Sequence, residues 1–225
     1  MPQQLKLAIS DILFSCVFPP TTIPRRRGIL YGMIQHSGSP ASQTHFIGVS
    51  VPDHLSSILS DCRSWMGEKF GCRSGFMTPF HVTLVPPFAL SDPELIGNLA
   101  AAIASCAREQ SAFSARARGF GTFAERTLFA RVEPDERWGL LREALYARLA
   151  AALPDLLRKD TRPFVPHLTV ANRDIPAFAV APALRYLEEI ALDETFPADN
   201  ITLFERRHGV WEPALTETLR AAPRG

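Results

Sequence analysis

The sequence lacks the features of a membrane protein and of a strongly charged nucleic-acid binder. The most apolar early segment, Leu5–Phe18, is too short to cross a bilayer, and it is neither preceded by positive charge nor followed by a convincing signal cleavage site. The 225 residues carry 24 basic and 23 acidic side chains, a net charge of +1. That balance gives no global electrostatic basis for tight duplex binding, although a phosphate-bearing ligand needs few local positive groups. We expect a soluble globular protein that does not act at a membrane.

Cysteine and cofactor motifs are also scarce. Cys16, Cys62, Cys72 and Cys106 form no C-x-x-C pair and have no histidine at zinc-ligand spacing, which argues against a zinc site or a disulfide framework. The sequence has no P-loop, H-E-x-x-H or G-x-S-x-G pattern, and Gly119–Gly121 is too short for a nucleotide-binding loop. We expect reduced thiols, a cytoplasmic location, and no metal or cofactor.

The first 44 residues differ in composition from the rest of the chain. A mostly apolar stretch ends at a pair of prolines, and residues 36–44 are typical of a linker. We interpret residues 1–44 as an N-terminal extension and linker of poor order. Alternatively, translation begins at Met33, which would leave residues 1–32 outside the biological protein.

From residue 45 onward, one cycle of elements is predicted twice. Each copy reads strand, helix, strand, helix, strand, with proline and aspartate at several helix starts. The first copy predicts strands over 45–51, at His81 and over 113–120, and helices over 52–69 and 91–108. The second predicts strands over 127–132, at His167 and over 200–205, and helices over 136–153 and 182–191. The repetition predicts an α+β domain over 45–225 made of two pseudo-symmetric lobes, about 45–122 and 123–225.

Two segments share the pattern His, apolar, Thr, apolar: His81–Leu84 and His167–Val170. Because strand side chains alternate between faces, His and Thr would project together while the aliphatic residues enter the core. A single strand histidine is usually structural. Two matched copies in matching contexts predict one shared site at a cleft between the lobes. The predicted catalytic residues are His81, Thr83, His167 and Thr169.

The residue types in these motifs suit phosphoryl chemistry. Histidine, with an ordinary pKa near ~6.5, can act as acid or base at neutral pH, and a pair can serve both ends of one displacement. Threonine hydroxyls can donate hydrogen bonds to non-bridging phosphate oxygens. Such a site needs no metal and predicts a bell-shaped pH profile. Which histidine is the acid is left open by the sequence.

Three further residues are candidates for substrate binding. Phe88 could stack on a nucleobase or fill the core. Arg173 could contact a phosphate or be a solvated loop residue, and Arg131 could point into the cleft or to solvent. The remaining histidines lack the motif and are expected on the surface or in loops, although His45 lies on the first predicted strand: His36, His45, His54 and His208.

With their placement in two like halves, the motifs resemble the 2H phosphoesterase superfamily. The stretches HVTLVPPF, FVPHLTVANR and ITLFERRHGVWEP are most similar to its bacterial 2′-5′ RNA ligase-like, or cyclic phosphodiesterase, branch. The resemblance implies a bilobal α+β fold with two antiparallel-rich sheets around a central cleft. It also implies metal-independent cleavage of 2′,3′-cyclic phosphates or 2′-5′ phosphodiesters, with 2′-5′ ligation as the reverse reaction. Many members carry Arg directly after H-x-T-x-x, where this chain has Asn172 followed by Arg173.

The expected partner is an RNA terminus, a cyclic nucleotide or another small phosphodiester, bound by a monomer. Two alternatives stay open. The chain could be a non-catalytic module on the same fold that binds RNA ends or nucleotides. It could also hydrolyse a phosphodiester outside RNA, such as a cyclic sugar phosphate.

Overall fold

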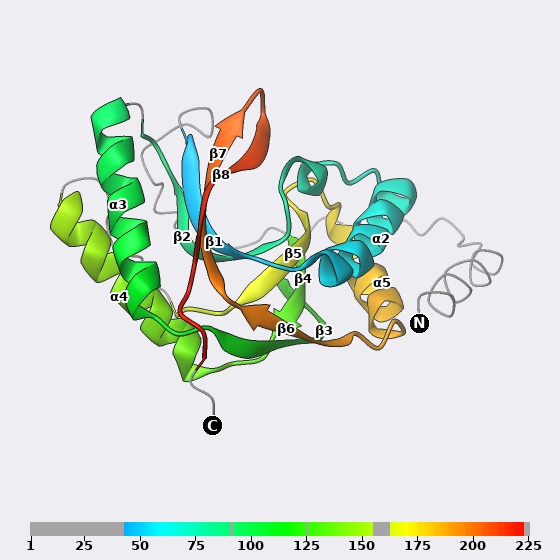
Figure 1. The fold of residues 1–225 in the computed structure, drawn as a ribbon. Helices are drawn as coiled ribbons and strands as arrows, with labels where there is room; N and C mark the ends of the chain where they lie inside the picture. Colours follow the sequence, from blue (N-terminus) through cyan, green and yellow to red (C-terminus); the bar gives the residue numbers. More distant parts are fainter. Residues whose placement is uncertain (1–42, 91, 125, 155–162, 223–225) are drawn as a thin grey trace, which may run out of the picture. The chain divides into compact units, whose positions relative to one another are not determined.

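Eight antiparallel strands form one sheet at the centre of the fold (Figure 1). The computed structural model describes residues 43–90, 92–124, 126–154 and 163–222, which all belong to one compact unit. The strand order is β6-β3-β4-β5-β2-β1-β7-β8. The strands are β1 (His45–Ser50), β2 (His81–Phe88), β3 (Phe113–Phe123), β4 (Thr127–Val132), β5 (His167–Asn172), β6 (Asp193–Ala198), β7 (Asn200–Arg207) and β8 (Val210–Thr218). The predicted extension over 1–44, apart from its last two residues, lies outside the described residues.

Four α-helices in the described residues pack as two pairs (Figure 1). One pair is α3 with α4, and α3 also contacts β7 and β8. The other is α2 with α5, which lie on β5 and β3. The helices are α2 (Asp53–Phe70), α3 (Pro93–Glu109), α4 (Glu136–Ala152) and α5 (Ala177–Glu188), and a short 3-10 helix, η3, spans Ser74–Met77. The predicted α+β class is confirmed.

The sheet is palindromic about its centre, where β5 and β2 carry the two H-x-T motifs. The pairing of Val82 with Leu168 joins these strands, so the two predicted sheets are connected into one. A late strand of each repeat pairs with the first strand of the other repeat: β3 pairs with β4, and β7 pairs with β1. The boundary near residue 122 therefore describes the sequence repeat, and the two halves of the sheet are drawn from both repeats.

Local sequence explains where two of the helices begin. Asp92 accepts a hydrogen bond from the backbone N–H of Glu94 at 2.9 Å, and Asp135 accepts one from Arg137 at 2.8 Å. These aspartates satisfy N–H groups that the first turn of a helix leaves without partners. The helices predicted over 91–108 and 136–153 are present as α3 and α4.

The prediction was wrong for the start of α5 and missed two strands. The helix begins at Ala177 and contains Pro182, which forfeits one intrahelical hydrogen bond instead of starting the helix. The missed strands, β6 and β8, are the two edges of the sheet and contain Pro197 and Pro213. Proline and charged residues are tolerated at edges, where one side of the strand makes no ladder, so the apolar alternation there is weak.

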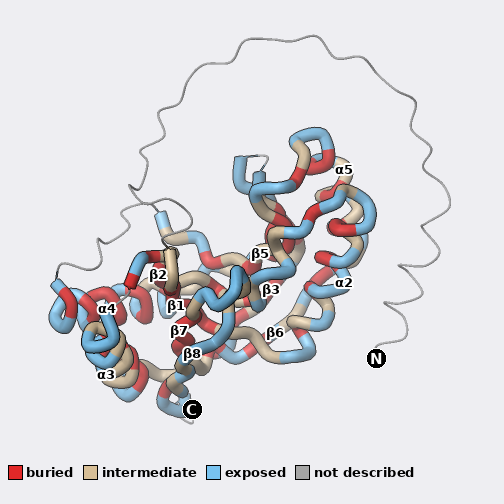
Figure 2. Tube along the Cα trace, turned by 90° about the horizontal axis from the view of Figure 1, so that it is seen from above, coloured by how far each residue is buried: buried red, intermediate tan, exposed pale blue. Residues whose placement is uncertain are grey.

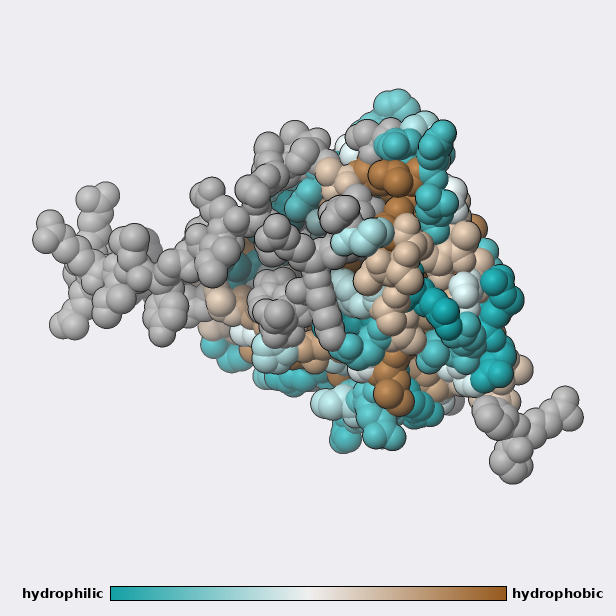
Figure 3. Space-filling view, turned by 90° about the vertical axis from the view of Figure 1, so that its left-hand side faces the viewer, coloured by the Kyte–Doolittle hydropathy of each residue, from teal (hydrophilic) through white to brown (hydrophobic). Residues whose placement is uncertain are grey.

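Apolar side chains from the sheet and the inner faces of the helices form one continuous core. The buried residues lie along both the strands and the helices (Figure 2). Buried residues recur along each helix at helical spacing, with exposed residues between them. On the side of the molecule that carries α3 and α4, the described surface shows hydrophilic areas on either side of a hydrophobic band (Figure 3). The helices thus cover the sheet with one face and meet solvent with the other.

Candidate active site

Strand alternation places the four motif side chains on one face of the central strands. Val82, Leu84, Leu168 and Val170 are at most 1% exposed, whereas the histidines and threonines between them are half-buried. Because β2 and β5 are antiparallel and Val82 is paired with Leu168, each histidine is next to the threonine of the other motif. The two motifs thus form one cluster at the centre of the sheet.

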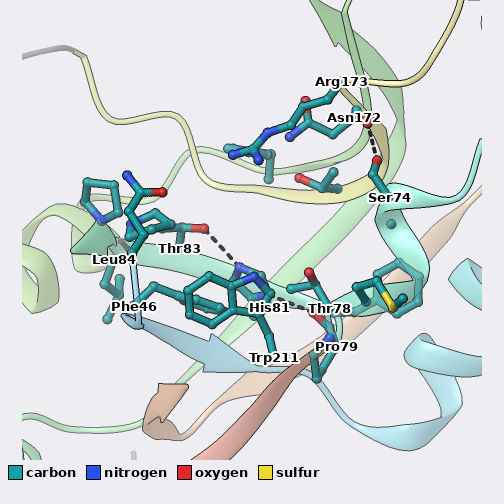
Figure 4. Close-up of a pocket in the computed structure, with 18 of the residues that line it drawn as sticks. Phe46, Ser74, Thr78, Pro79, His81, Thr83, Leu84, Asn172, Arg173 and Trp211 are labelled. Carbon is teal, nitrogen blue, oxygen red and sulfur yellow. Dashed lines mark hydrogen bonds between the residues drawn. The ribbon is translucent and has the colours of Figure 1, made fainter. Parts of the chain in front are cut away.

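Backbone carbonyl groups fix the tautomer of both imidazoles. Nδ1 of His81 is 2.7 Å from the carbonyl oxygen of Pro79, and Nδ1 of His167 is 2.8 Å from that of Val165. A carbonyl oxygen can only accept, so each Nδ1 carries a proton and each neutral ring leaves Nε2 as an acceptor. The Thr83 hydroxyl lies 3.1 Å from Nε2 of His81 and donates to it (Figure 4).

Each imidazole also rests against a stacked pair of phenylalanines. Phe46 and Phe204 stack at 4.4 Å between ring centroids, and both contact His81, at 4.4 and 5.3 Å. The equivalent pair beside the second histidine is Phe123 with Phe129 at 4.2 Å, and these rings lie 4.9 and 5.3 Å from His167. The two pairs come from β1 with β7 and from β4 with β3, which are equivalent strands in the palindromic sheet.

The phenylalanine rings beside the two histidines differ in exposure, and burial lowers the pKa of both histidines. Burial lowers the pKa of His81 from 6.5 to about 4; its hydrogen bond to Pro79 opposes this shift, and the charges of His167 and Arg63 add to it. Burial also lowers the pKa of His167. Phe123 beside His167 is 37% exposed, whereas the rings beside His81 are buried. Both imidazoles are therefore easily held neutral, and His167 is the one with more access to water.

The motifs line a cleft of about 890 Å³. Four arginines and no carboxylate are among the described residues that line it, which gives it a positive potential. Figure 4 views the cleft with His81, Thr83 and Trp211 on one side and Asn172 and Arg173 on the other. The arginines are Arg63, Arg142, Arg173 and Arg206.

The loop after β5 brings Arg173 to the cleft. Its φ of 66° is in the left-handed region, which a non-glycine residue adopts at a cost, and its N–H donates to the carbonyl of Arg126. The next residue, Asp174, accepts hydrogen bonds from the backbone N–H and hydroxyl of Ser74. Asn172 accepts one from the hydroxyl of Thr127 at 2.9 Å. The loop is thus tied to β4 and η3 in a shape that aims Arg173 across the cleft (Figure 4).

Comparison with known proteins decides the family. A family model of the 2'-5' RNA ligase superfamily matches residues 51–210, a span that includes both H-x-T motifs. The chain belongs to the 2'-5' RNA ligase superfamily. This membership confirms the resemblance inferred from the paired motifs and indicates phosphodiesterase or ligase-type activity. No curated protein matches the chain closely enough to be counted as a relative.

Solved structures of related fold agree with the superfamily assignment. TT0787 of Thermus thermophilus is 23% identical, with a TM-score of 0.60 over 79% of this chain and 98% of that one. E. coli LigT complexed with 3'-AMP is 18% identical, with a TM-score of 0.54 over the same shares of the two chains. At these identities, the likeness is one of fold.

In this superfamily member, the structure brings five of the seven predicted site residues to the cleft. Phe88 is not among them: it is 9% exposed and stacks on His45, so it has the core role that was its alternative. Arg131 of β4 is paired with His167 of β5 and lies on the same face of the sheet, but it does not line the cleft. The five are His81, Thr83, His167, Thr169 and Arg173.

The other histidines mostly match expectation. His54 and His208 are exposed, and His36 lies outside the described residues. His45, expected in a surface or loop position, is 3% exposed; its Nδ1 is 2.8 Å from the hydroxyl of Thr44, and burial lowers its pKa. It is a core residue because β1 lies between β2 and β7 in the sheet.

Among the cleft residues that sequence reasoning missed are Arg63, Arg142 and Trp211. Trp211 belongs to the unpredicted β8 and contacts Phe46 edge-on at 4.8 Å. The arginines did leave a signal, because both interrupt the apolar stripe of an amphipathic helix. A charged residue on a buried helix face needs bonded partners, so such an interruption marks a functional candidate.

Within the described ranges, no three side chains of His, Cys, Asp or Glu gather as metal ligands would. None of the helices in those ranges is both long and apolar enough to span a membrane.

Proposed function

We propose that this protein hydrolyses 2′,3′-cyclic phosphates or 2′-5′ phosphodiesters of RNA-derived substrates without a metal, with reversible 2′-5′ ligation as the reverse reaction. One observation carries the proposal. Two imidazoles with the same Nδ1-anchored tautomer lie, with both motif threonines, in a cleft that four arginines and no described carboxylate line. Such a cleft attracts an anion and offers two groups able to transfer protons.

The reaction on a cyclic phosphate then has a simple proton balance. Nε2 of one neutral imidazole accepts a proton from water as the water oxygen bonds to phosphorus. The bond between phosphorus and one ribose oxygen breaks, and that oxygen takes a proton from Nε2 of the other, protonated imidazole. Thr83 and Thr169 donate hydrogen bonds to the non-bridging oxygens, where negative charge increases in the transition state. The two histidines end with their protonation states exchanged.

Substrate binding is assigned to the charged and aromatic groups around this centre. Arg173, aimed across the cleft, would pair with the phosphate in place of an arginine at position 172. Arg131, on the same sheet face beyond His167, would meet a longer RNA substrate outside the cleft. The complexes of E. coli LigT with 3'-AMP and ATP are consistent with a nucleotide-like ligand.

The test is hydrolysis of nucleoside 2′,3′-cyclic phosphates and of a 2′-5′-linked dinucleotide by the purified full-length chain in EDTA. We expect turnover of at least one substrate, and a loss of at least about 10³-fold in His81→Ala and His167→Ala. His54→Ala, which changes an exposed histidine of α2, is the matched control and should retain wild-type rates.

Three results would contradict the proposal. Activity that EDTA abolishes would show that a metal is required. Activity that survives both cleft histidine substitutions would place the chemistry elsewhere. Binding of the cyclic nucleotide without turnover would favour the non-catalytic binding module instead.

A further inference from the structure

Two arginines are buried beneath the cleft, on the inner faces of α2 and α4. Arg63 is 8% exposed and Arg142 is 7% exposed. Burial lowers the pKa of Arg63 to about 10, so it is still charged at neutral pH. Among the described residues, no carboxylate lies within ion-pair distance of Arg63. Holding a charge in such a place is costly, which points to a purpose other than stability.

Arg63 connects three parts of the site. Its Nη1 donates to the carbonyl oxygen of Thr78 at 2.9 Å, and its Nη2 donates to that of Thr169 at 3.0 Å. The guanidinium also lies 3.7 Å above the ring of Phe80, the residue before His81. A helix of the first repeat therefore holds the second H-x-T strand in register with the first.

Arg142 makes the reciprocal connection. Its Nε donates to the carbonyl oxygen of Leu84, the last residue of the first motif, at 3.1 Å. Its guanidinium lies 5.0 Å from the ring of Phe164, which precedes the second motif. A helix of the second repeat thus holds the strand of the first.

We propose that Arg63 and Arg142 are reciprocal positioning residues, each fixing the H-x-T strand of the opposite repeat, and that Arg63, stacked on Phe80 directly before His81 in the same cleft, also places its charge near His81. The contacts match in kind: each arginine bonds a backbone carbonyl of the opposite motif and packs on the aromatic residue that precedes its own. The planar guanidinium suits both contacts, since it can donate in its plane while stacking on a ring.

The charge of Arg63 separates the two arginines experimentally. The groups around His81 are His167 from β5, Arg63 from α2, Arg206 of β7 further along the cleft, and the uncharged ring of Phe46 from β1. Burial is the main reason that the pKa of His81 is low, and the charges of His167 and Arg63 lower it further. We therefore expect removal of the charge of Arg63 to raise that pKa, whereas Arg142 is not among the charges that lower it.

The experiment compares Arg63→Gln with Arg142→Gln, both checked for folding by circular dichroism. We expect each to lower kcat by about 10- to 100-fold, because a displaced motif strand misplaces the reacting groups. Only Arg63→Gln should move the acid limb of kcat/KM to higher pH, by about half a unit or more. An acid limb that stays in place in Arg63→Gln, or moves equally in both variants, would overturn the assignment.

Arg63→Lys separates charge from geometry. Lysine keeps the charge but lacks the fork that joins two carbonyl groups, so the acid limb should stay near the wild-type position while kcat stays low. Wild-type kcat in Arg63→Lys would contradict the positioning role, even if Arg63→Gln fails to fold.

The kinetic readout rests on the proposed function, whereas NMR titration of the His81 ring does not need turnover. A higher pKa of His81 in Arg63→Gln than in wild type and Arg142→Gln would support the inference even in a protein without activity. Unchanged titration would overturn it while leaving the proposed function intact.

Discussion

At the scale of single residues, two copies of one motif give two different histidines. Both rings have Nδ1 held by a backbone carbonyl, and both contact a phenylalanine pair. Only His81 has both rings of its pair buried and a hydroxyl 3.1 Å from Nε2. The two imidazoles therefore differ in proton affinity although their sequence motifs are the same.

These affinities predict an acidic optimum for the free enzyme. Catalysis needs one imidazole neutral and one protonated, a state that is most populated between the two pKa values. With His81 near 4 and His167 below 6.5, kcat/KM should peak between about pH 4 and 6.5 and fall tenfold per unit above it. A pH series with a nucleoside 2′,3′-cyclic phosphate measures this. A plateau that extends to pH 8 would contradict it.

The threonine hydroxyls should contribute in the transition state. Replacing Thr83 or Thr169 by valine keeps the branched shape that a strand favours but removes the donor, so we expect kcat to fall by about 10²-fold with a smaller change in KM. Serine at either position restores the hydroxyl and should recover much of the rate. Equal losses for the valine and serine variants would show that packing, and not hydrogen bonding, is what matters.

At the scale of elements, the pairing of β1 with β2 depends on a close backbone approach at Gly48. A Cβ there would stand 2.8 Å from the carbonyl oxygen of Val82 and 3.2 Å from Cδ2 of His81. Gly48→Ala should therefore cost about 1–3 kcal/mol of unfolding free energy and reduce activity, because β1 and the His81 ring must move.

Gly97 provides the matched control in denaturant unfolding. It is an exposed residue inside α3, and apart from its chain neighbours and the backbone of the helix itself no atom lies within 4 Å of where its Cβ would be. Gly97→Ala should raise the unfolding free energy by about 0.5–1 kcal/mol. Equal effects at the two glycines would show that the close contact at Gly48 is relieved without cost.

Helices and strands were predicted correctly where their apolar residues face the core at regular spacing. The strands with alternating buried residues and the helices with aspartate caps were found, because apolar periodicity and capping residues can be recognised in short stretches of sequence. The edge strands β6 and β8 were missed because their pairing depends on the neighbouring strands β3 and β7, and their own sequences have no regular apolar alternation. Trp211 was missed with β8.

At the scale of the whole molecule, burying neutral histidines makes stability depend on pH. His81 has a folded pKa near 4 and an unfolded pKa of 6.5, so its contribution is full above pH 6.5 and is lost as pH falls toward 4. The loss for this one group is on the order of 3 kcal/mol at pH 4.

Urea unfolding of wild type and His81→Gln between pH 8 and 4 tests this. The wild type should lose about 3 kcal/mol more than the variant. The pKa values of His45 and His167 are also lowered, so these two groups reduce stability at low pH in both proteins alike. The aspartates with lowered pKa values reduce stability only as the pH falls below 3.8. Parallel losses in the two proteins would contradict the assignment to His81.

The α+β class, the order of most elements and the paired H-x-T motifs follow from the amino-acid sequence, because periodicity, caps and a duplicated pattern are local properties. The exchange of strands between the repeats, and the contacts of Arg63 and Arg142 with the opposite motifs, are visible only in the folded chain. Folding also places Phe88 in the core and Arg173 in the cleft. Contacts between segments far apart in the chain depend on which strands pair, and pairing is set by packing of the whole sheet and its helices.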